Sequence, residues 1–418
     1  MVKVAQLSNK IRVITDEMPD VETVSLGIWV SVGARYEEEN INGISHLLEH
    51  MAFKGTTSRS ALKIAEEIEN VGGVINAYTS RDVTAYYVKV LKENTQLALD
   101  ILTDIFQNSV MDEEELTREK GVVIQEIGQT YDAPDDAVFE YFQSTAYPDQ
   151  PFGRSILGTA QKVSDISRET LLAYMHDEYT APRVIVSAAG HIEHERLVSE
   201  IARLMTKLKS AGGRQMQPAR YEGGEYREEK KIEQVNLVLG FPCLTYQHPL
   251  YYAQTILSTL LGGGMSSRLF QEIREKRGLV YAIYAFASAY EDGGTFGIFA
   301  GTGEKQAAEL LPVVCEELKK IGDTLKEEEI ERAKAQLRAH VLMKRESTSS
   351  RAESNARSMA IYGRVISKEE TIQRINEVNA NMLKQTADLL FAEKPTLAVL
   401  GPVSHVMSYD KLLDALKK

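Results

Sequence analysis

The second half of the chain repeats the sequence pattern of its first half, and this limits the fold to an arrangement of two similar domains. Four segments recur in the same order at an offset of roughly 205 to 215 residues, as internal repeats do. The matched pairs are Ser25-Leu-Gly-Ile-Trp29 with Asn236-Leu-Val-Leu-Gly240, Gly73-Val-Ile-Asn-Ala77 with Gly278-Leu-Val-Tyr-Ala282, Glu113–Lys120 with Glu327–Lys334, and Pro182–Ser187 with Pro395–Leu400. A length of 418 residues also exceeds what a single hydrophobic core usually serves. We therefore predict two tandem, homologous α+β domains.

The composition between the repeats suggests where the two domains meet. Residues 211–226 are rich in Gly, Arg and Glu and include Pro218, which is typical of a linker. We expect an N-terminal domain over residues 1–210, a linker over 211–226 and a C-terminal domain over 227–418.

Hydrophobic periodicity predicts alternating strands and helices in the first half. Strands are expected over residues 10–15 and 23–32, a hairpin over 74–90 that turns near Ser80, and helices over 43–55, 60–70, 96–107 and from Asp112 onwards. Asp112 and Glu115 resemble a capping box at the start of the last helix.

The helix predicted over residues 43–55 carries His46, Glu49 and His50. In an α-helix the two histidines lie one turn apart on one face with the glutamate beside them, while apolar residues occupy the opposite face. His-x-x-Glu-His is the inverzincin pattern, in which the imidazoles bind zinc and the carboxylate is the general base. A buried helix with two hydrogen-bonded histidines would show the same letters.

A third metal ligand is expected on the helix that begins at Asp112. Glu119 and Glu126 are seven residues apart, so both lie on one face of that helix. Either could bind the metal, although acidic side chains on helices are usually solvated.

The equivalent place in the second half, Ser258–Phe270, has no His or Glu at the ligand positions, so only one half is expected to carry the chemistry. Its three glycines, Gly262 to Gly264, lack the Gly-Lys-Ser/Thr ending of a phosphate loop. A close-packed loop that ends a helix is the better interpretation.

Charge and composition exclude several classes of partner. The net charge of −12 argues against nucleic acid and against an anionic membrane surface, and no apolar run approaches a membrane span. Cys243 and Cys315 are too few for a disulfide framework and are expected to be core thiols of a reducing compartment. The N-terminus has no signal-peptide pattern, so a cytoplasmic protein is expected.

Three segments together resemble the pitrilysin (M16) family of zinc peptidases. They are His46-Leu-Leu-Glu-His50-Met-Ala-Phe-Lys-Gly-Thr56, Asn76-Ala-Tyr-Thr-Ser80 and Arg118-Glu-Lys-Gly-Val-Val-Ile-Gln-Glu126. The chain is most similar to the small processing-peptidase branch (M16B), which includes the beta subunit of mitochondrial processing peptidase and its bacterial relatives. The resemblance covers essentially the whole chain.

This resemblance implies roles for individual residues. It implies one zinc ion per chain, bound by His46, His50 and Glu126, with Glu49 as the general base. Glu119 matches a second acidic position near the site, expected to orient a ligand. In the second half, Arg274 and Tyr281 match residues that contact the substrate, and the strand near Asn76 and Ala77 is similar to the edge that receives the substrate by strand addition.

The resemblance also implies an architecture and a function. Each domain would be an α/β sandwich, a mixed or antiparallel sheet flanked by helices, and two chains would pair as a homodimer around a clam-like chamber. Inside it, short or unfolded peptides would be hydrolysed. The alternative is a non-catalytic or partner-dependent structural subunit of a processing-peptidase-like complex, because one fold can serve both functions.

Overall fold

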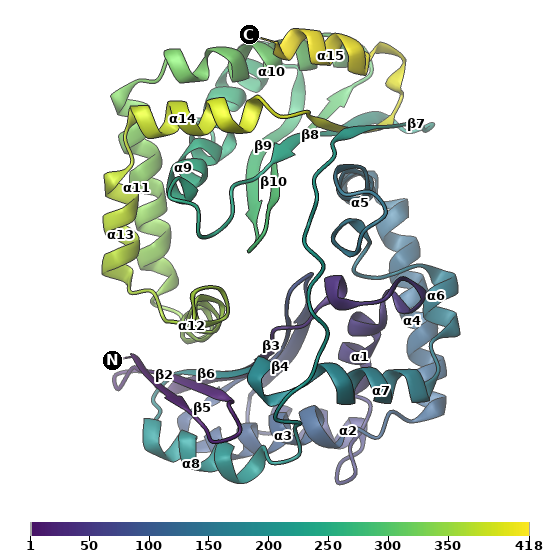
Figure 1. Cartoon of the computed structure of the whole chain (residues 1–418), viewed down its shortest axis with the longest axis vertical. Helices are drawn as coiled ribbons and strands as arrows, with labels where there is room; N and C mark the ends of the chain where they lie inside the picture. The colour runs from purple at the N-terminus through teal and green to yellow at the C-terminus, as the bar shows by residue number, and fades with distance from the viewer. Residues whose placement is uncertain (1, 418) are drawn as a thin grey trace. The chain divides into compact units, whose positions relative to one another are not determined.

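The computed structural model describes residues 2–417 and divides them into two compact units, each built on one sheet (Figure 1). The first unit comprises the chain up to Gly128, Arg154–Gln217 and Leu342–Ile366. The second comprises Gln129–Gly153, Pro218–Val341 and the chain from Ser367 onwards.

The first unit contains a six-stranded mixed sheet in the order β1-β2-β6-β3-β5-β4. Its strands are β1 (Val2–Gln6), β2 (Arg12–Glu17), β3 (Thr23–Val30), β4 (Val74–Thr79), β5 (Thr84–Leu91) and β6 (Val184–Gly190). Its helices are α1 (Ile44–Ala52), α2 (Ala61–Glu69), α3 (Thr95–Asn108), most of α4 (Glu113–Asp132), α6 (Ala160–Asp165), α7 (Arg168–Glu178), α8 (His194–Leu204) and α12 (Thr348–Tyr362). Only β2 and β6 pair in parallel.

The second unit contains a five-stranded sheet in the order β7-β11-β8-β10-β9, with β7 and β11 parallel. Its strands are β7 (Gly224–Glu229), β8 (Gln234–Pro242), β9 (Val280–Ala289), β10 (Gly294–Gly303) and β11 (Thr396–Gly401). Its helices are α5 (Pro134–Ala146), α9 (Tyr251–Gly262), α10 (Ala307–Lys320), most of α11 (Glu327–Lys344), α13 (Lys368–Glu377), α14 (Ala380–Phe391) and α15 (Tyr409–Leu416). A π-helical turn spans Phe270–Glu275.

The two sheets have the same strand order once β1 is set aside, which confirms the prediction of two similar domains. β2, β6, β3, β5 and β4 correspond to β7, β11, β8, β10 and β9. All four repeated segment pairs fall on equivalent elements: β3 and β8, the starts of β4 and β9, the starts of α4 and α11, and β6 and β11. The predicted fold class, two mixed sheets flanked by helices, is confirmed.

Each unit takes one helix from the other half of the sequence. α5 packs on β7, β8 and β11, and α12 packs on the equivalent strands β2, β3 and β6 (Figure 1). The compact units therefore interleave along the chain, whereas residues 1–210, 211–226 and 227–418 are contiguous ranges that follow the repeat. The expected division into these three ranges therefore stays a prediction.

Most predicted elements lie within two residues of their expected bounds, and the differences have local causes. The first expected strand begins at Arg12 because Lys10 has a left-handed φ of 78° in the preceding turn. Strand β1 was not predicted, although it pairs along its whole length with β2. Strand β7 begins at Gly224, inside the range expected for the linker, and pairs there with β11.

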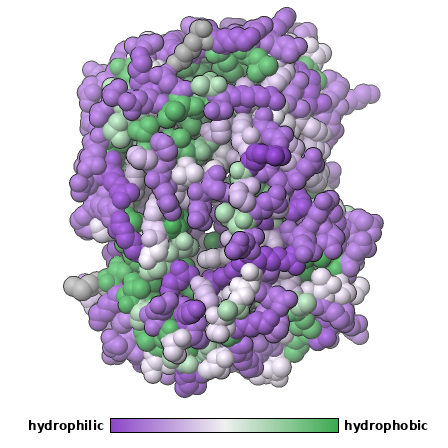
Figure 2. All heavy atoms as spheres, viewed as in Figure 1, coloured by the Kyte–Doolittle hydropathy of each residue, from purple (hydrophilic) through white to green (hydrophobic). Residues whose placement is uncertain are grey.

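The surface and the thiols agree with the composition. Figure 2 shows hydrophilic residues over most of the face turned to the viewer, with hydrophobic residues in patches. Cys243 and Cys315 are buried and not disulfide-bonded, as expected for core thiols. Within residues 2–417, no helix has the length and hydrophobicity needed to cross a membrane.

Candidate metal centre

Helix α1 presents the motif on one face and buries the other. Ile44, Leu47, Leu48 and Met51 are at most 1 % exposed, as the apolar spacing predicted. The helix begins after Gly43, whose φ of 100° is a left-handed conformation that favours glycine. A Cβ at Gly43 would also lie only 2.6 Å from the carbonyl oxygen of Leu157.

His46, His50 and Glu126 bring three ligand atoms to one point. The Nε2 atoms of both histidines lie 3.7 Å from the same oxygen, Oε2 of Glu126. All three ligand atoms lie within 4.8 Å of one another, and this is the one such group of His, Cys, Asp or Glu found in residues 2–417.

This arrangement fits zinc. Ligand atoms about 2.0–2.1 Å from a tetrahedral zinc lie roughly 3.4 Å from one another, close to the separations here. Two imidazole nitrogens and one carboxylate oxygen also leave the fourth position open, as in catalytic rather than structural zinc sites. Burial, together with the charge of His50, lowers the pKa of His46 to about 4, so its ring is neutral at pH 7 and free to bind a metal.

Glu119 contacts the back of His50 instead of joining the ligand atoms. Its Oε2 lies 3.0 Å from His50 Nδ1, and its Oε1 lies 2.6 Å from Lys54 Nζ. A proton on Nδ1 donated to this carboxylate leaves the Nε2 lone pair directed at Glu126. Glu119 is only 6 % exposed, and Lys54 offsets its buried charge.

Glu49 lies between the two histidines in the helix and is fixed from strand β4. The Thr79 hydroxyl donates a hydrogen bond of 2.6 Å to Glu49 Oε2. Burial raises the pKa of Glu49, the Thr79 hydrogen bond and His50 oppose the shift, and the charge of Glu126 adds to it. A carboxylate with a raised pKa is a stronger base, which suits proton transfer.

Glu37 is a fully buried carboxylate that holds the start of α1. Its Oε2 accepts hydrogen bonds from the Gly43 backbone N–H and from Asn42 Nδ2, and its Oε1 accepts one from the Ser45 N–H, all of 2.8 Å. These backbone N–H groups are those a helix leaves unpaired at its N-terminus. Burial raises the pKa of Glu37, while the three donors oppose the shift.

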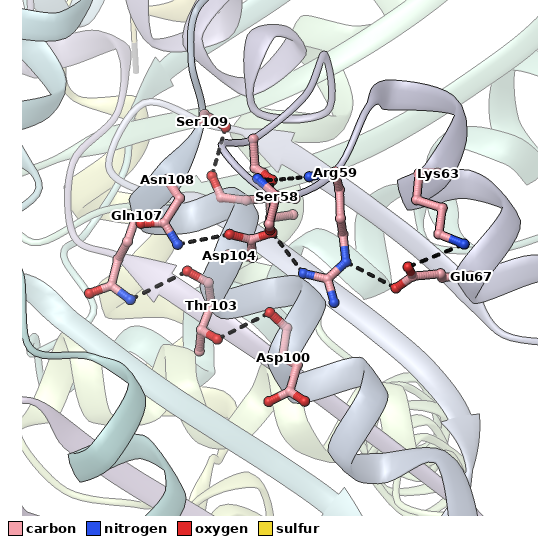
Figure 3. A network of polar contacts seen from close by, with 12 residues as sticks. Ser58, Arg59, Lys63, Glu67, Asp100, Thr103, Asp104, Gln107, Asn108 and Ser109 are labelled. Atoms are coloured by element: carbon pink, nitrogen blue, oxygen red, sulfur yellow. Dashed lines mark hydrogen bonds and ion pairs between the residues drawn. The ribbon is translucent and has the colours of Figure 1, made fainter.

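The loop that follows α1 is held by Asp104 of helix α3 (Figure 3). Asp104 Oδ2 accepts hydrogen bonds from Thr56 Oγ1, Ser58 Oγ and Arg59 Nη1, at 2.8, 2.6 and 2.7 Å. Asn108 donates to the other carboxylate oxygen at 2.8 Å. Burial raises the pKa of Asp104, but these four hydrogen bonds outweigh it, and the net shift is downward. The C-terminal end of the segment that bears the His-x-x-Glu-His motif is therefore fixed to α3.

Asn76 and Ala77 lie on β4, the strand at the open edge of the first sheet. The Ala77 N–H donates to the side-chain oxygen of Asn76 at 2.8 Å, not to the neighbouring strand β5. This N–H is therefore an edge donor, held by the side chain beside it.

Arg274 and Tyr281 lie together in the second unit. The Arg274 guanidinium is 4.8 Å from the ring centre of Phe270 and 5.7 Å from that of Tyr281. Tyr281 is 78 % exposed and is available for contact. That the pair reaches substrate stays a prediction.

Three residues around the site were not identified from the sequence as functional: Glu37, Lys54 and Thr79. Lys54 and Thr79 lie inside the quoted motif segments but have no distinctive spacing. Glu37 is seven residues ahead of Ile44, the first residue of the helix that it caps, beyond the usual range of a capping pattern. The acidic residue before a helix N-terminus was the only available signal.

The chain is similar to known zinc proteases over nearly its whole length. Residues 12–160 match the family described as Insulinase (Peptidase family M16), and residues 165–337 match the Peptidase M16 inactive domain. A zinc protease of Rickettsia felis is 41 % identical over 400 residues, which cover 96 % of this chain and 97 % of that protein. A zinc protease of Bacillus subtilis is 37 % identical over 410 residues, 98 % of this chain and all of the relative. The probable beta subunit of the mitochondrial-processing peptidase of Arabidopsis thaliana is 34 % identical over 425 residues, 98 % of this chain and 80 % of that protein.

Solved structures share the fold. A protease from Helicobacter pylori matches with a TM-score of 0.88 at 22 % identity, over 96 % of this chain and 99 % of the other. A chain of the complex III dimer from Candida albicans matches with a TM-score of 0.87 at 18 % identity over the full length of both. The identity and coverage of the sequence relatives confirm the resemblance: the chain belongs to peptidase family M16, the pitrilysin family of zinc peptidases.

Proposed function

We propose that this protein is a zinc-dependent endopeptidase that cleaves short or unfolded peptides. The observation that carries the proposal is the convergence of His46, His50 and Glu126 on one point with Glu49 on the same helix face. His46, His50 and Glu126 would hold one zinc ion per chain. When bound, zinc supplies Lewis acidity toward the scissile carbonyl and lowers the pKa of water toward neutrality.

Residues of the protein itself would transfer the proton and hold the reacting groups in position. Glu49 accepts a proton from the attacking water and later delivers it to the leaving amine, while Thr79 fixes the carboxylate that does so. Glu119 holds His50 in the tautomer and orientation that ligation needs.

Substrate binding is proposed to use the open edge of β4. A peptide strand added there would take over the Ala77 N–H from Asn76 and gain main-chain hydrogen bonds without regard to sequence. Tyr281 and Arg274 are proposed to bind the substrate backbone or its developing negative charge. A homodimeric chamber that admits only unfolded chains, in the cytoplasm, completes the proposal.

The decisive experiment compares wild type with Glu49→Gln. Zinc content is measured by elemental analysis, and cleavage is measured on a library of unstructured peptides. We expect about one zinc per chain in both proteins and cleavage by wild type alone, since Gln cannot accept the proton. Glu69→Gln, an exposed substitution at the end of α2, is the matched control and should cleave as wild type does.

The outcomes separate the hypotheses. Substantial cleavage by Glu49→Gln would refute the role of Glu49 as base. Zinc in both proteins with no cleavage by either would favour the structural-subunit alternative or a missing partner chain. The mass of the active species, from light scattering, tests the homodimer.

A further inference from the structure

A cavity of about 250 Å³ lies on the face of the first sheet that carries α12. Ligand pockets for drug-sized molecules begin at about 300 Å³, so this one has the size of a single side chain. Its aromatic lining consists of Trp29 of β3, Tyr78 of β4 and Tyr87 of β5, and Ser350 and Glu353 of α12 also line it.

The strand register joins this cavity to the open edge. Asn76 pairs with Tyr87, and Tyr87 pairs with Gly27, so these three residues share one face of the sheet. Thr79 points the opposite way, toward Glu49. A peptide strand paired with β4 would therefore alternate its side chains between the face of the metal centre and the face of the cavity.

Small residues lie along this path. Asn76 is small and exposed, so a long side chain opposite it can reach across to Tyr87. Gly27 makes room for the Trp29 ring that lines the cavity: a Cβ at Gly27 would lie 2.8 Å from ring atoms of Trp29, so only glycine lets the indole lie over the strand. The Trp29 N–H donates to the Tyr78 hydroxyl at 3.2 Å and fixes both rings.

Charged groups of both signs act on the rings of the cavity, and one of them, Glu353, lines it. Burial and the charge of Glu353 raise the pKa of Tyr78 to about 12, and the charge of Arg357 opposes that shift. A carboxylate and a guanidinium therefore both act at this ring. The three rings favour an aromatic guest through stacked or edge-to-face contacts.

We propose that this cavity is a specificity pocket that takes an aromatic side chain of the peptide substrate, from the residue that lies opposite Asn76. The inference rests on the proposed endopeptidase function, because it needs a peptide strand at the edge of β4. It predicts a preference at a single substrate position, within about three residues of the cut.

The first test is kinetic. Unstructured peptides that differ in one residue, Phe, Ala, Lys or Glu, are placed in turn through the three positions on each side of the cut. We expect wild type to prefer Phe over Ala in kcat/KM by roughly 2- to 10-fold at one position, the range of a single aromatic contact. Tyr87→Ala should bring this ratio near one, and Tyr87→Phe, which keeps the ring, should preserve it. Lys89→Ala, exposed on the same strand and face, is the matched control.

The second test needs no catalysis. Trp29 is the only tryptophan of the chain, so its emission reports directly on the cavity. Titration of Glu49→Gln with N-acetyl-phenylalaninamide should give a saturable emission change, which N-acetyl-alaninamide should not give and which the added substitution Tyr87→Ala should abolish.

The two tests also separate this inference from the proposed function. If no peptide is cleaved but the fluorescence response appears, the endopeptidase proposal fails, while the cavity is still shown to bind an aromatic side chain. If cleavage occurs without a Phe preference, with a preference for Lys at that position, or with a preference that Tyr87→Ala leaves intact, the pocket assignment is wrong.

Discussion

Glu37 fixes helix α1, which bears the His-x-x-Glu-His motif, from outside the motif. It supplies acceptors for three donors at the start of α1 and is itself fully buried. We expect Glu37→Ala to lower the free energy of unfolding by about 3 kcal/mol, because three buried donors lose their acceptor. Urea unfolding of the zinc-free protein measures this.

Glu39→Ala is the control for that prediction, since Glu39 is exposed two residues further on. It should change stability by no more than about 0.5 kcal/mol. Equal urea midpoints for the two variants would show that the buried carboxylate does not hold the helix.

A second prediction at the scale of a residue concerns Glu119, the partner of the proposed metal ligand His50. Glu119→Gln keeps the size of the side chain but removes the charge that faces His50 Nδ1 and Lys54 Nζ. We expect zinc affinity to fall by about 10- to 100-fold, measured by competition with a chromogenic chelator. Glu115→Gln, one turn earlier on α4 and paired with Arg118 at the surface, should leave the affinity unchanged. If Glu119→Gln binds zinc as tightly as wild type does, Glu119 does not position His50 for the metal.

At the scale of elements, Asp104 joins the loop after α1 to α3. Its pKa is lowered in the folded protein, so its contribution to stability is present above the unfolded pKa of about 3.9 and is lost as the pH falls through the folded value. We expect Asp104→Asn to lower the melting temperature of the zinc-free protein near neutral pH. The difference in melting temperature between this variant and wild type should become smaller below about pH 4. Asp20→Asn, in an exposed turn, should show no such convergence. A gap that stays constant from pH 7 to pH 3 would contradict the prediction.

The exchanged helix α12 is held by polar as well as apolar contacts. Asp16 of β2 is buried and pairs with Arg345 and Arg351 at 3.2 and 3.1 Å, and the Ser187 hydroxyl donates to the Ala352 carbonyl at 2.8 Å. Beneath the helix, Ala352 and Met359 pack with Trp29. α12 is therefore part of the core of the first unit, although it lies far from it in sequence.

At the scale of the whole molecule, this exchange predicts that the first half does not fold alone. A fragment of residues 1–217 lacks α12 and should expose Trp29 and its neighbours, bind a hydrophobic dye and unfold without cooperativity. Adding a peptide of residues 342–366 should reduce dye binding and shift the Trp29 emission to the blue. A peptide of residues 134–146, which packs on the other sheet, should do neither. A fragment that melts cooperatively by itself would contradict this.

The sequence by itself determined the features that depend on local period and repetition. A helix places residues three and four apart on one face, so His46, Glu49 and His50 had to be presented together once their segment was helical. The repeated segments determined two equivalent sheets, because similar patterns of strands and helices bury their apolar faces in the same way. Asp112 caps α4 as expected, by accepting from the backbone N–H groups of Glu114 and Glu115.

Only the tertiary structure decided the features that depend on how elements approach one another. Glu119 and Glu126 share a helix face, so their spacing could not show which of them faces the metal-binding atoms of the histidines. The approach of α4 to α1 places Glu126 at Nε2 of His50 and Glu119 at Nδ1. The contact of Glu37 with α1 and the exchange of α5 and α12 leave no periodic signal, because they join groups that chain geometry alone does not bring together. The local sequence pattern determines which face of a helix or strand a residue occupies, whereas tertiary packing determines which residues it contacts there.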